Sequence, residues 1–112
     1  MAPAERPSGL PMPPHALVRW VQLTVDPLHR EAFLNLFHRH KTAIRQFPGC
    51  LSMVLLEGPA PGTFFTLSTW ESESDLDAYR TSGLFAEIWP PIKALFSAPA
   101  RAWSVRPLDI PA

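Results

Sequence analysis

The pattern of hydrophobic and polar positions along the chain predicts four β-strands. Residues 17–25, 50–57, 63–71 and 102–108 are rich in β-branched, aromatic and aliphatic side chains over lengths typical of strands. The sequence Gly58-Pro-Ala-Pro-Gly62 between the second and third segments has the composition of a turn. The second and third strands are therefore expected to form a hairpin.

A long helix is predicted between the first and second strands. Asp26-Pro27 marks its start, because an acceptor at the N-cap and a proline at the first helical position are both favoured there. The helix is expected to run to about Phe47, where Pro48-Gly49 stops it. Its apolar side chains recur at the helical period and form one stripe, which comprises Ala32, Phe33, Leu36, Phe37, Ala43, Ile44 and Phe47.

A second helical region, in pieces, is predicted between the third and fourth strands. Ser72 is an N-cap ahead of one short helix, and Ser82 caps another. Pro90-Pro91 is expected to break or kink the second piece, because proline lacks the backbone donor and clashes with the preceding turn. Residues 92–96 then continue as a separate helical turn.

The predicted order βαββαβ defines the fold class. It is that of an α+β, ferredoxin-like sandwich, in which both helical regions cover one face of a four-stranded antiparallel sheet. Both faces of the strands are nevertheless largely apolar: Val18, Trp20, Val54, Leu56, Phe65 and Leu67 point opposite to Leu17, Val21, Leu23, Leu51, Met53, Leu55, Phe64 and Trp70. An exposed face of this kind exceeds what a soluble monomer usually shows. We therefore expect a homodimer whose sheets meet face to face about a two-fold axis.

Composition narrows the class of protein. A chain of 112 residues is one domain, and 46% hydrophobic residues supply a core. The formal net charge of zero argues against a nucleic-acid partner, and no apolar run approaches the roughly 20 residues of a membrane span. The single Cys50 excludes an intrachain disulfide and, with four scattered histidines, argues against a thiolate zinc site. A reducing, cytoplasmic location is expected.

Proline is the unusual component, with 14 residues in the chain. Five of them fall within the first 14 positions, which prevents a helix interior or a strand ladder there. Residues 1–15 are therefore expected to be a disordered or loosely docked arm, and residues 16–112 the folded domain. A polyproline ligand for a partner is the alternative interpretation of the arm.

Four motifs carry a resemblance to a known family: Phe47-Pro-Gly-Cys50, Phe65-Thr-Leu-Ser-Thr-Trp-Glu-Ser72, Leu76-Asp-Ala-Tyr79 and Ser82-Gly-Leu-Phe85. With these motifs at this separation, residues 17–108 resemble the antibiotic biosynthesis monooxygenase domain family. The resemblance implies a dimeric α+β barrel built from ferredoxin-like units. It also implies several activities, since some members oxidise aromatic phenols or quinols with molecular oxygen without metal or flavin, others degrade heme, and others have no established activity.

The heme-degrading branch of that family uses an Asn on the first strand, a Trp on the second helix and a His one helix further on. Val21 or Gln22, Tyr79 and Trp89 hold the matching positions here. The axial His is therefore missing, which argues against heme degradation by that mechanism. No cofactor and no metal ligand are expected.

Trp70 and His40 are the candidate catalytic residues. Trp70 matches the strand-end Trp of family oxygenases, which lies in the cavity between sheet and helices, and its indole N–H can donate to a phenolate or quinone oxygen. His40 lies within the apolar stripe of the first helix, and a neutral imidazole there can take a proton from a phenol. The alternatives are a core Trp that ends a strand and a buried His satisfied by a carbonyl or a water molecule.

Tyr79, Phe85 and Trp89 are the candidate substrate-binding residues, because together they can form the boundary of an aromatic cavity. Packing of the helices on the sheet is the alternative role for all three. Two functions follow. The first is a cofactor-independent monooxygenase that acts on an electron-rich aromatic or quinol, and the second is a non-catalytic dimeric barrel that binds a small hydrophobic or aromatic molecule.

Overall fold

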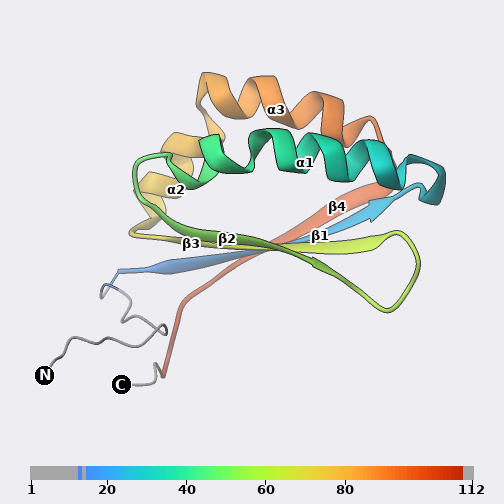
Figure 1. Ribbon diagram of the computed structural model, residues 1–112. Helices are drawn as coiled ribbons and strands as arrows, with labels where there is room; N and C mark the ends of the chain where they lie inside the picture. The colour runs from blue at the N-terminus through green and yellow to red at the C-terminus, as the bar shows by residue number, and fades with distance from the viewer. Residues whose placement is uncertain (1–12, 14, 110–112) are drawn as a thin grey trace, which may run out of the picture.

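Four strands and three helices form a two-layer α+β sandwich in a computed structural model, which describes residue 13 and residues 15–109. The elements are β1 (Leu17–Val25), the 3₁₀ turn η2 (Pro27–His29), α1 (Arg30–Arg45), β2 (Cys50–Glu57), β3 (Thr63–Trp70), α2 (Glu73–Arg80), α3 (Gly83–Lys93) and β4 (Phe96–Val105). All three helices lie on one side of the sheet (Figure 1). The predicted ferredoxin-like fold class is therefore confirmed. The expected arm over residues 1–15 lies, apart from residues 13 and 15, outside the described residues.

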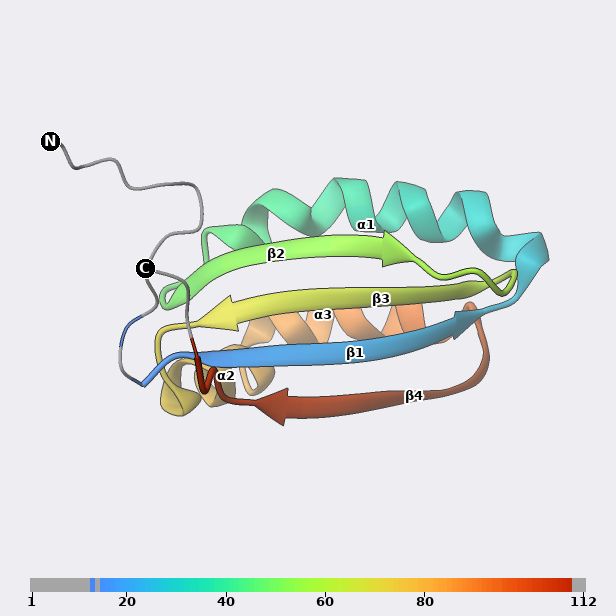
Figure 2. The same ribbon diagram turned by 90° about the horizontal axis from the view of Figure 1, so that it is seen from below.

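The sheet has the strand order β2-β3-β1-β4, and every neighbouring pair is antiparallel (Figure 2). This is the order expected when each helical connection returns the chain across the same face. We call the face turned toward the helices the inner face and the opposite one the outer face. The central strand β1 aligns Arg19 with Ser68 of β3 on one side and with Ser104 of β4 on the other. These three residues thus form one row across the inner face.

Side-chain caps begin the helices where the sequence predicts them. The Asp26 carboxylate accepts a hydrogen bond from the Leu28 backbone N–H at 2.9 Å, but the first turn is 3₁₀ and the α-helix begins only at Arg30. The Ser72 hydroxyl accepts from the N–H of Asp75 at 3.2 Å, and the Ser82 hydroxyl does the same for Phe85. These bonds satisfy backbone donors that have no partner in the first turn of a helix.

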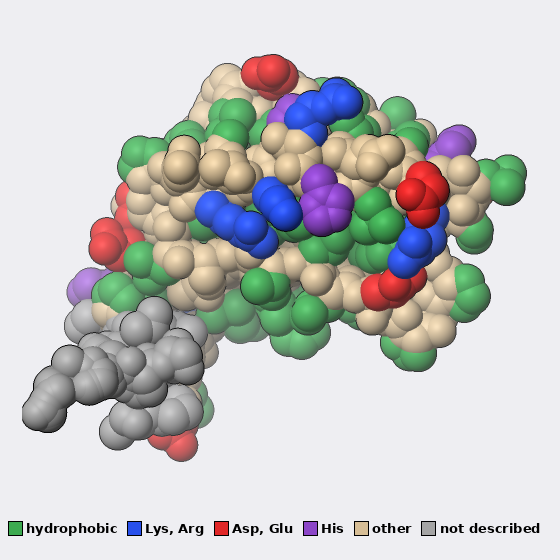
Figure 3. Space-filling model, in the orientation of Figure 1, with side chains coloured by type: hydrophobic (Ala, Val, Ile, Leu, Met, Phe, Trp, Pro, Cys, Tyr) green, Lys and Arg blue, Asp and Glu red, His purple; other side chains and the backbone are tan. Residues whose placement is uncertain are grey.

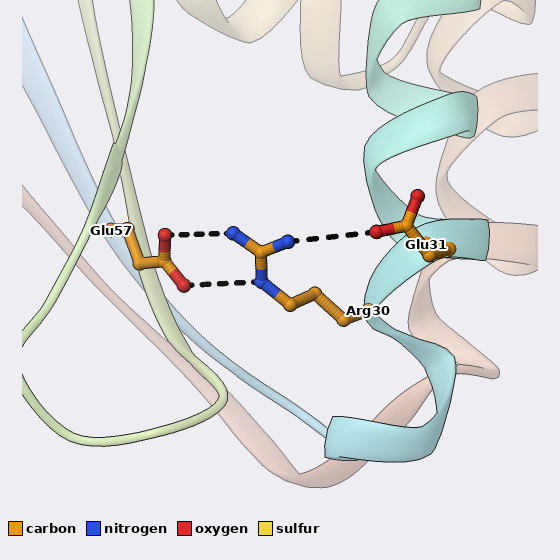
Figure 4. Close-up of polar contacts among 3 residues, drawn as sticks. All are labelled: Arg30, Glu31 and Glu57. Atoms are coloured by element: carbon orange, nitrogen blue, oxygen red, sulfur yellow. Dashed lines mark hydrogen bonds and ion pairs between the residues drawn. The ribbon is translucent and has the colours of Figure 1, made fainter.

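An ion pair joins the start of α1 to the end of β2 (Figure 4). The Arg30 guanidinium donates from Nη2 and Nε to the two carboxylate oxygens of Glu57, at 2.9 and 3.2 Å. Glu31 approaches the same guanidinium at 3.6 Å. The two-pronged geometry favours the Glu57 pair, although exposed ion pairs stabilise proteins only weakly.

Two predictions about the last third of the chain are wrong. Pro90 and Pro91 do not break the helix, because α3 runs through both to Lys93, so residues 92–96 form no separate helical turn. The carbonyls that lose their partners belong to exposed residues of the preceding turn, where water can satisfy them, while Ile88 and Ile92 anchor the helix on its buried side. The last strand also begins at Phe96 instead of residue 102.

The early start of β4 is possible because β4 is an edge strand. Its register against β1 shifts on both sides of Thr24, and Pro99 falls in the irregular stretch between the pairs Gln22–Arg101 and Thr24–Ala98. Proline is tolerated at such positions because no ladder hydrogen bond is required of it.

The core lies between the inner face and the helices, in two clusters. The larger cluster contains Leu23, Val25, Phe33, Phe37, Ile44, Met53, Phe64, Ile88 and Ile92, and the smaller contains Leu17, Trp70 and Leu76. One residue departs from the predicted alternation: Leu51 is 46% exposed, because the β2 register shifts between Cys50 and Ser52 and Cys50 packs against the core instead.

The helices leave the outer face of the sheet uncovered (Figure 2), and this face carries large apolar side chains. Trp20, Val54, Leu56, Trp103 and Val105 are each 40–45% exposed. Hydrophobic side chains are also visible along the lower edge in Figure 3, on the sheet side of the molecule. Across the described part of the chain, no helix combines the length and apolarity that a membrane crossing requires.

Candidate functional site

A cavity of about 360 Å³ lies between the inner face and the helices. The strands contribute Arg19, Val21, Leu23, Met53, Thr66, Ser68, Trp70, Ala100 and Ala102, and the helices contribute Phe33, Phe37, Ile44, Leu76, Tyr79, Arg80, Phe85, Ile88, Trp89 and Ile92. Its volume lies in the range of small-molecule sites, which are mostly apolar with a few placed polar groups. Arg80 is exposed and lines the cavity, so the cavity reaches the surface at the end of α2.

Four aromatic side chains form one boundary of the cavity, and we call Trp70, Tyr79, Phe85 and Trp89 the aromatic wall. Trp70 stacks on Tyr79 with ring centroids 5.1 Å apart, and Phe85 stacks on Trp89 at 5.7 Å. Tyr79 and Phe85 join the two stacks edge to face at 5.2 Å. The sequence predicted these four residues for the site, and the fold brings all of them together around one space.

Trp70 is held by a hydrogen bond within its own strand. Its ring is 1% exposed, and its indole N–H donates to the Ser68 hydroxyl oxygen at 2.9 Å. The donor that we expected to meet a ligand oxygen is therefore engaged with the protein. Because the Ser68 hydroxyl accepts in this bond, its own proton is left to donate toward the cavity that it lines.

Tyr79 is a neutral phenol at physiological pH. Burial, together with a smaller contribution from the negative charge that the neighbouring Cys50 side chain carries when ionised, raises the pKa of Tyr79 to about 12. Burial likewise raises the pKa of the Cys50 thiol, a shift that a backbone hydrogen bond at Ser52 and the charge of Arg45 only partly oppose. Tyr79 therefore offers a hydroxyl donor within the aromatic wall, and Cys50 stays a protonated thiol packed against the core.

His40 is placed outside the site. It is half-buried on α1, but it is not among the cavity-lining residues, although Phe37 and Ile44 on the same stripe are. The described lining contains no His, Asp or Glu side chain at all. Over residues 15–109, no three His, Cys, Asp or Glu side chains cluster closely enough to hold a metal ion.

Two cationic side chains that the sequence did not single out, those of Arg19 and Arg80, also line the cavity. Arg19 lies near the start of β1 and donates from Nη1 to the Ser104 hydroxyl at 2.8 Å, and Arg80 ends α2. Burial and the nearby Arg80 guanidinium lower the pKa of Arg19, while Asp77 partly offsets this effect. The sequence could have indicated that Arg19 faces the helices, because alternation along β1 puts it on the same face as Leu17 and Val21.

The arrangement combines a flat aromatic boundary with a polar end. Thr66, Ser68, Tyr79 and the two guanidiniums offer hydrogen-bond donors, whereas the rest of the lining is apolar. Such a site can hold a planar ring and fix the direction of its oxygen substituents. Guanidiniums near a phenolic oxygen also favour its ionised form.

Comparisons with known proteins agree with this architecture. A protein from Methanosarcina mazei Go1 has 22% sequence identity and a TM-score of 0.78, over 82% of this chain and 92% of that chain. Rv0793 from Mycobacterium tuberculosis has 23% identity and a TM-score of 0.78, over 87% and 99%. A protein named antibiotic biosynthesis monooxygenase has 22% identity and a TM-score of 0.77, over 83% and 99%. At these identities the likeness establishes the fold.

The sequence itself is matched at the level of a family. No curated protein matches the chain. Residues 17–89, from β1 to Trp89 of the aromatic wall, match the family described as antibiotic biosynthesis monooxygenase. The chain belongs to the antibiotic biosynthesis monooxygenase family.

Proposed function

We propose that the protein is a cofactor-independent monooxygenase that oxidises an electron-rich aromatic or quinol with molecular oxygen. The observation that carries this proposal is the cavity of about 360 Å³, bounded by the aromatic wall and supplied with hydroxyl and guanidinium donors, in a chain of the monooxygenase family. A ring-sized substrate fits this space because the aromatic side chains line the cavity without filling it.

The proposed reaction needs no electron source besides the substrate. One atom of oxygen replaces a ring hydrogen as a hydroxyl group, and the other leaves as water. The quinol becomes a hydroxyquinone, so it supplies all four electrons and both protons of the water molecule. The protein has to orient the ring, favour the electron-rich phenolate and limit access of water to the intermediate.

The lining residues divide these tasks. Stacking on the aromatic wall orients the ring, and hydroxyl donors of Ser68 and Tyr79 bind its oxygens. The positive charge of Arg19 stabilises the phenolate, whose proton passes to water because the described lining offers no carboxylate or imidazole. The same lack of an acid or base favours the second candidate function, a non-catalytic barrel that binds a small aromatic molecule.

We also propose that the protein acts as a homodimer through the outer face. Trp20, Trp103 and Val105 border a shallow groove there, and Val54 and Leu56 extend the apolar surface. Trp103→Glu is expected to produce monomers in native mass spectrometry, whereas Thr42→Glu on the exposed side of α1 leaves the dimer intact. A wild-type monomer at micromolar concentration would contradict this assembly.

Oxygen uptake with a panel of hydroquinones tests the activity. Ala102→Leu places a larger side chain at the cavity and is expected to abolish uptake, while Ala78→Leu makes the same exchange on the exposed side of α2. Trp70→Phe is expected to reduce uptake, and His40→Ala is expected to preserve it because His40 lies outside the lining. Uptake unchanged in Ala102→Leu, with folding intact, would place the reaction elsewhere. Ligand binding without uptake by any hydroquinone would support the non-catalytic alternative.

A further inference from the structure

Among the described residues, the two arginines of the cavity have no anionic partner in an ion pair. Arg19 is half-buried on the inner face, and its hydrogen bond goes to a neutral hydroxyl, that of Ser104. Among the ion pairs that the described residues form, neither Arg19 nor Arg80 takes part. Asp77 on α2 is near enough to act on Arg19 through its charge, but it makes no ion pair with it.

Partial burial of the Arg19 guanidinium is unfavourable, because it removes part of the charge from water. Charges inside proteins are normally paired, because transfer from water is costly without compensation. An apolar residue at position 19 would continue the inner-face pattern of Leu17, Val21 and Leu23. The chain instead places the Arg19 guanidinium there, in the lining of the cavity. The guanidinium of Arg80 lines the same cavity where it reaches the surface.

We propose that the ligand of this cavity is an aromatic acid, held at its ionised end by Arg19 and Arg80. This inference rests on the proposed function only in using the same cavity, and it names the class of substrate. The planar guanidinium matches a carboxylate with two parallel hydrogen bonds, and such charge-assisted bonds are the stronger class. The described lining holds no carboxylate that competes for the two cations.

The ring then lies where the aromatic wall can stack on it. Tyr79 directly precedes Arg80 on α2 and lines the same cavity, so the acid-binding and ring-binding parts of the site are contiguous. The Ser68 hydroxyl lies in the same cross-strand row as Arg19 and can donate to a further oxygen on the ring. The acid group thus fixes the orientation of the bound substrate, with its ionised end at the two arginines and its ring at the aromatic wall.

Binding of two inert probes of equal size tests the proposal on the full chain. The probes are 2-naphthoate and its neutral amide, 2-naphthamide, measured by isothermal titration calorimetry at low and high salt. We expect the acid to bind roughly tenfold or more tightly than the amide at low salt, because only the acid makes charge-assisted hydrogen bonds. Added salt is expected to reduce that preference.

Variants assign the preference to the two arginines. Arg80→Gln changes an exposed helix end and is expected to reduce the preference with folding intact, and Arg19→Gln with Arg80→Gln to abolish it. Arg19→Lys keeps the positive charge and serves if the variants with Arg19→Gln do not fold. It is expected to retain part of the preference for the acid over the amide. Arg39→Gln, an exposed position on α1 outside the cavity, is the matched control and is expected to change nothing.

Several results would overturn the inference. These are equal binding of acid and amide to the wild type, a preference that survives in the double variant, and no binding of either probe at millimolar concentration. Oxygen uptake separates this inference from the proposed function. Uptake with a neutral hydroquinone but no acid preference leaves the monooxygenase without an acid site. An acid preference without uptake by any acid-bearing hydroquinone leaves a binding protein for aromatic acids.

Discussion

The hydrogen bond between the Trp70 indole and the Ser68 hydroxyl holds the first ring of the aromatic wall, and Ser68→Ala removes it. Trp70 is 1% exposed and Ser68 8% exposed, so the bond, 2.9 Å long, lies away from bulk water. The exchange deletes a single oxygen atom, so little packing is lost. It leaves a buried N–H without a partner, which costs about 1–3 kcal/mol. We therefore expect the free energy of unfolding to fall by about that amount and Tm by at least about 4 °C.

A double-mutant cycle isolates this contact. Unfolding in urea is followed by far-UV circular dichroism for Ser68→Ala, Trp70→Phe and the double variant, at one protein concentration so that any self-association stays constant. In the Trp70→Phe background no indole N–H is present to lose its partner, so Ser68→Ala is expected to cost much less. The coupling energy is expected to be about 1–2 kcal/mol.

The control for this cycle is Ser52→Ala, which makes the same exchange at an exposed strand position on β2. It is expected to change the free energy of unfolding by less than about 0.5 kcal/mol. The reasoning would be refuted if Ser68→Ala cost no more than Ser52→Ala. It would also be refuted if Ser68→Ala cost as much without Trp70 as with it.

Three further predictions follow from single contacts. Gly49→Ala is expected to destabilise the fold by at least about 2 kcal/mol in urea unfolding, because Gly49 has φ +89° and a Cβ there would overlap the Asp75 side chain; wild-type stability would contradict this. Tyr79 is the single tyrosine, so the near-ultraviolet tyrosinate signal of the folded protein is expected to rise only near pH 12, and its stabilisation, present below pH 10.0, to be lost between the two values. A native signal already rising near pH 10.0 would refute the burial of that hydroxyl. The hydrogen bonds from Arg30 lower the pKa of Glu57, so the stabilisation by this pair is present above the ordinary glutamate pKa and is lost as pH falls through the lowered one. An NMR titration is expected to show the Glu57 pKa returning toward its ordinary value in Arg30→Gln, and an unchanged value would contradict the pairing.

Capping residues and hydrophobic periodicity predicted most of the fold, because the helices and strands that they favour locally are also those that pack in the folded protein. Ser72 and Ser82 cap helices wherever a chain passes from loop to helix, so these starts depend little on the rest of the molecule. The failures occur where tertiary context decides. Pro90-Pro91 is tolerated within α3 because the carbonyls that lose their partners, those of Ala86 and Glu87, belong to exposed residues, and the rule that proline ends a helix does not consider which side those carbonyls face.

The candidate site was predictable in its aromatic part and not in its polar part. The aromatic wall follows from helix and strand periodicity, which brings Tyr79 and Trp89 toward the sheet. Alternation along β1 also places Arg19 on the inner face, but no other residue of the strand indicates what a single charge among apolar side chains would bind. His40 shows the opposite error, since it shares the period of the apolar stripe and yet lies outside the lining. Periodicity selects a helix face, and the position of the cavity along that face depends on how the layers cross.

The cavity includes positions at which the sheet presents small side chains. The helices present large rings such as Phe37 and Trp89, whereas the sheet presents small side chains at Ser68, Ala100 and Ala102. Protein interiors are normally close-packed, so an open cavity lowers the free energy of unfolding relative to a filled one and leaves room for a ligand.

Ala102→Leu is therefore expected to act in opposite directions on stability and function. Ala102 is exposed on the edge strand β4, so the added leucine side chain is buried only in part; it is expected to raise the free energy of unfolding by up to about 1 kcal/mol while it abolishes oxygen uptake. Urea unfolding and oxygen uptake on the same preparation test both signs, with Ala78→Leu on α2, outside the cavity lining, as the control. A destabilised Ala102→Leu protein would mean that the space at β4 is already filled by its neighbours, and a stabilised protein that still consumed oxygen would separate this cavity from the reaction.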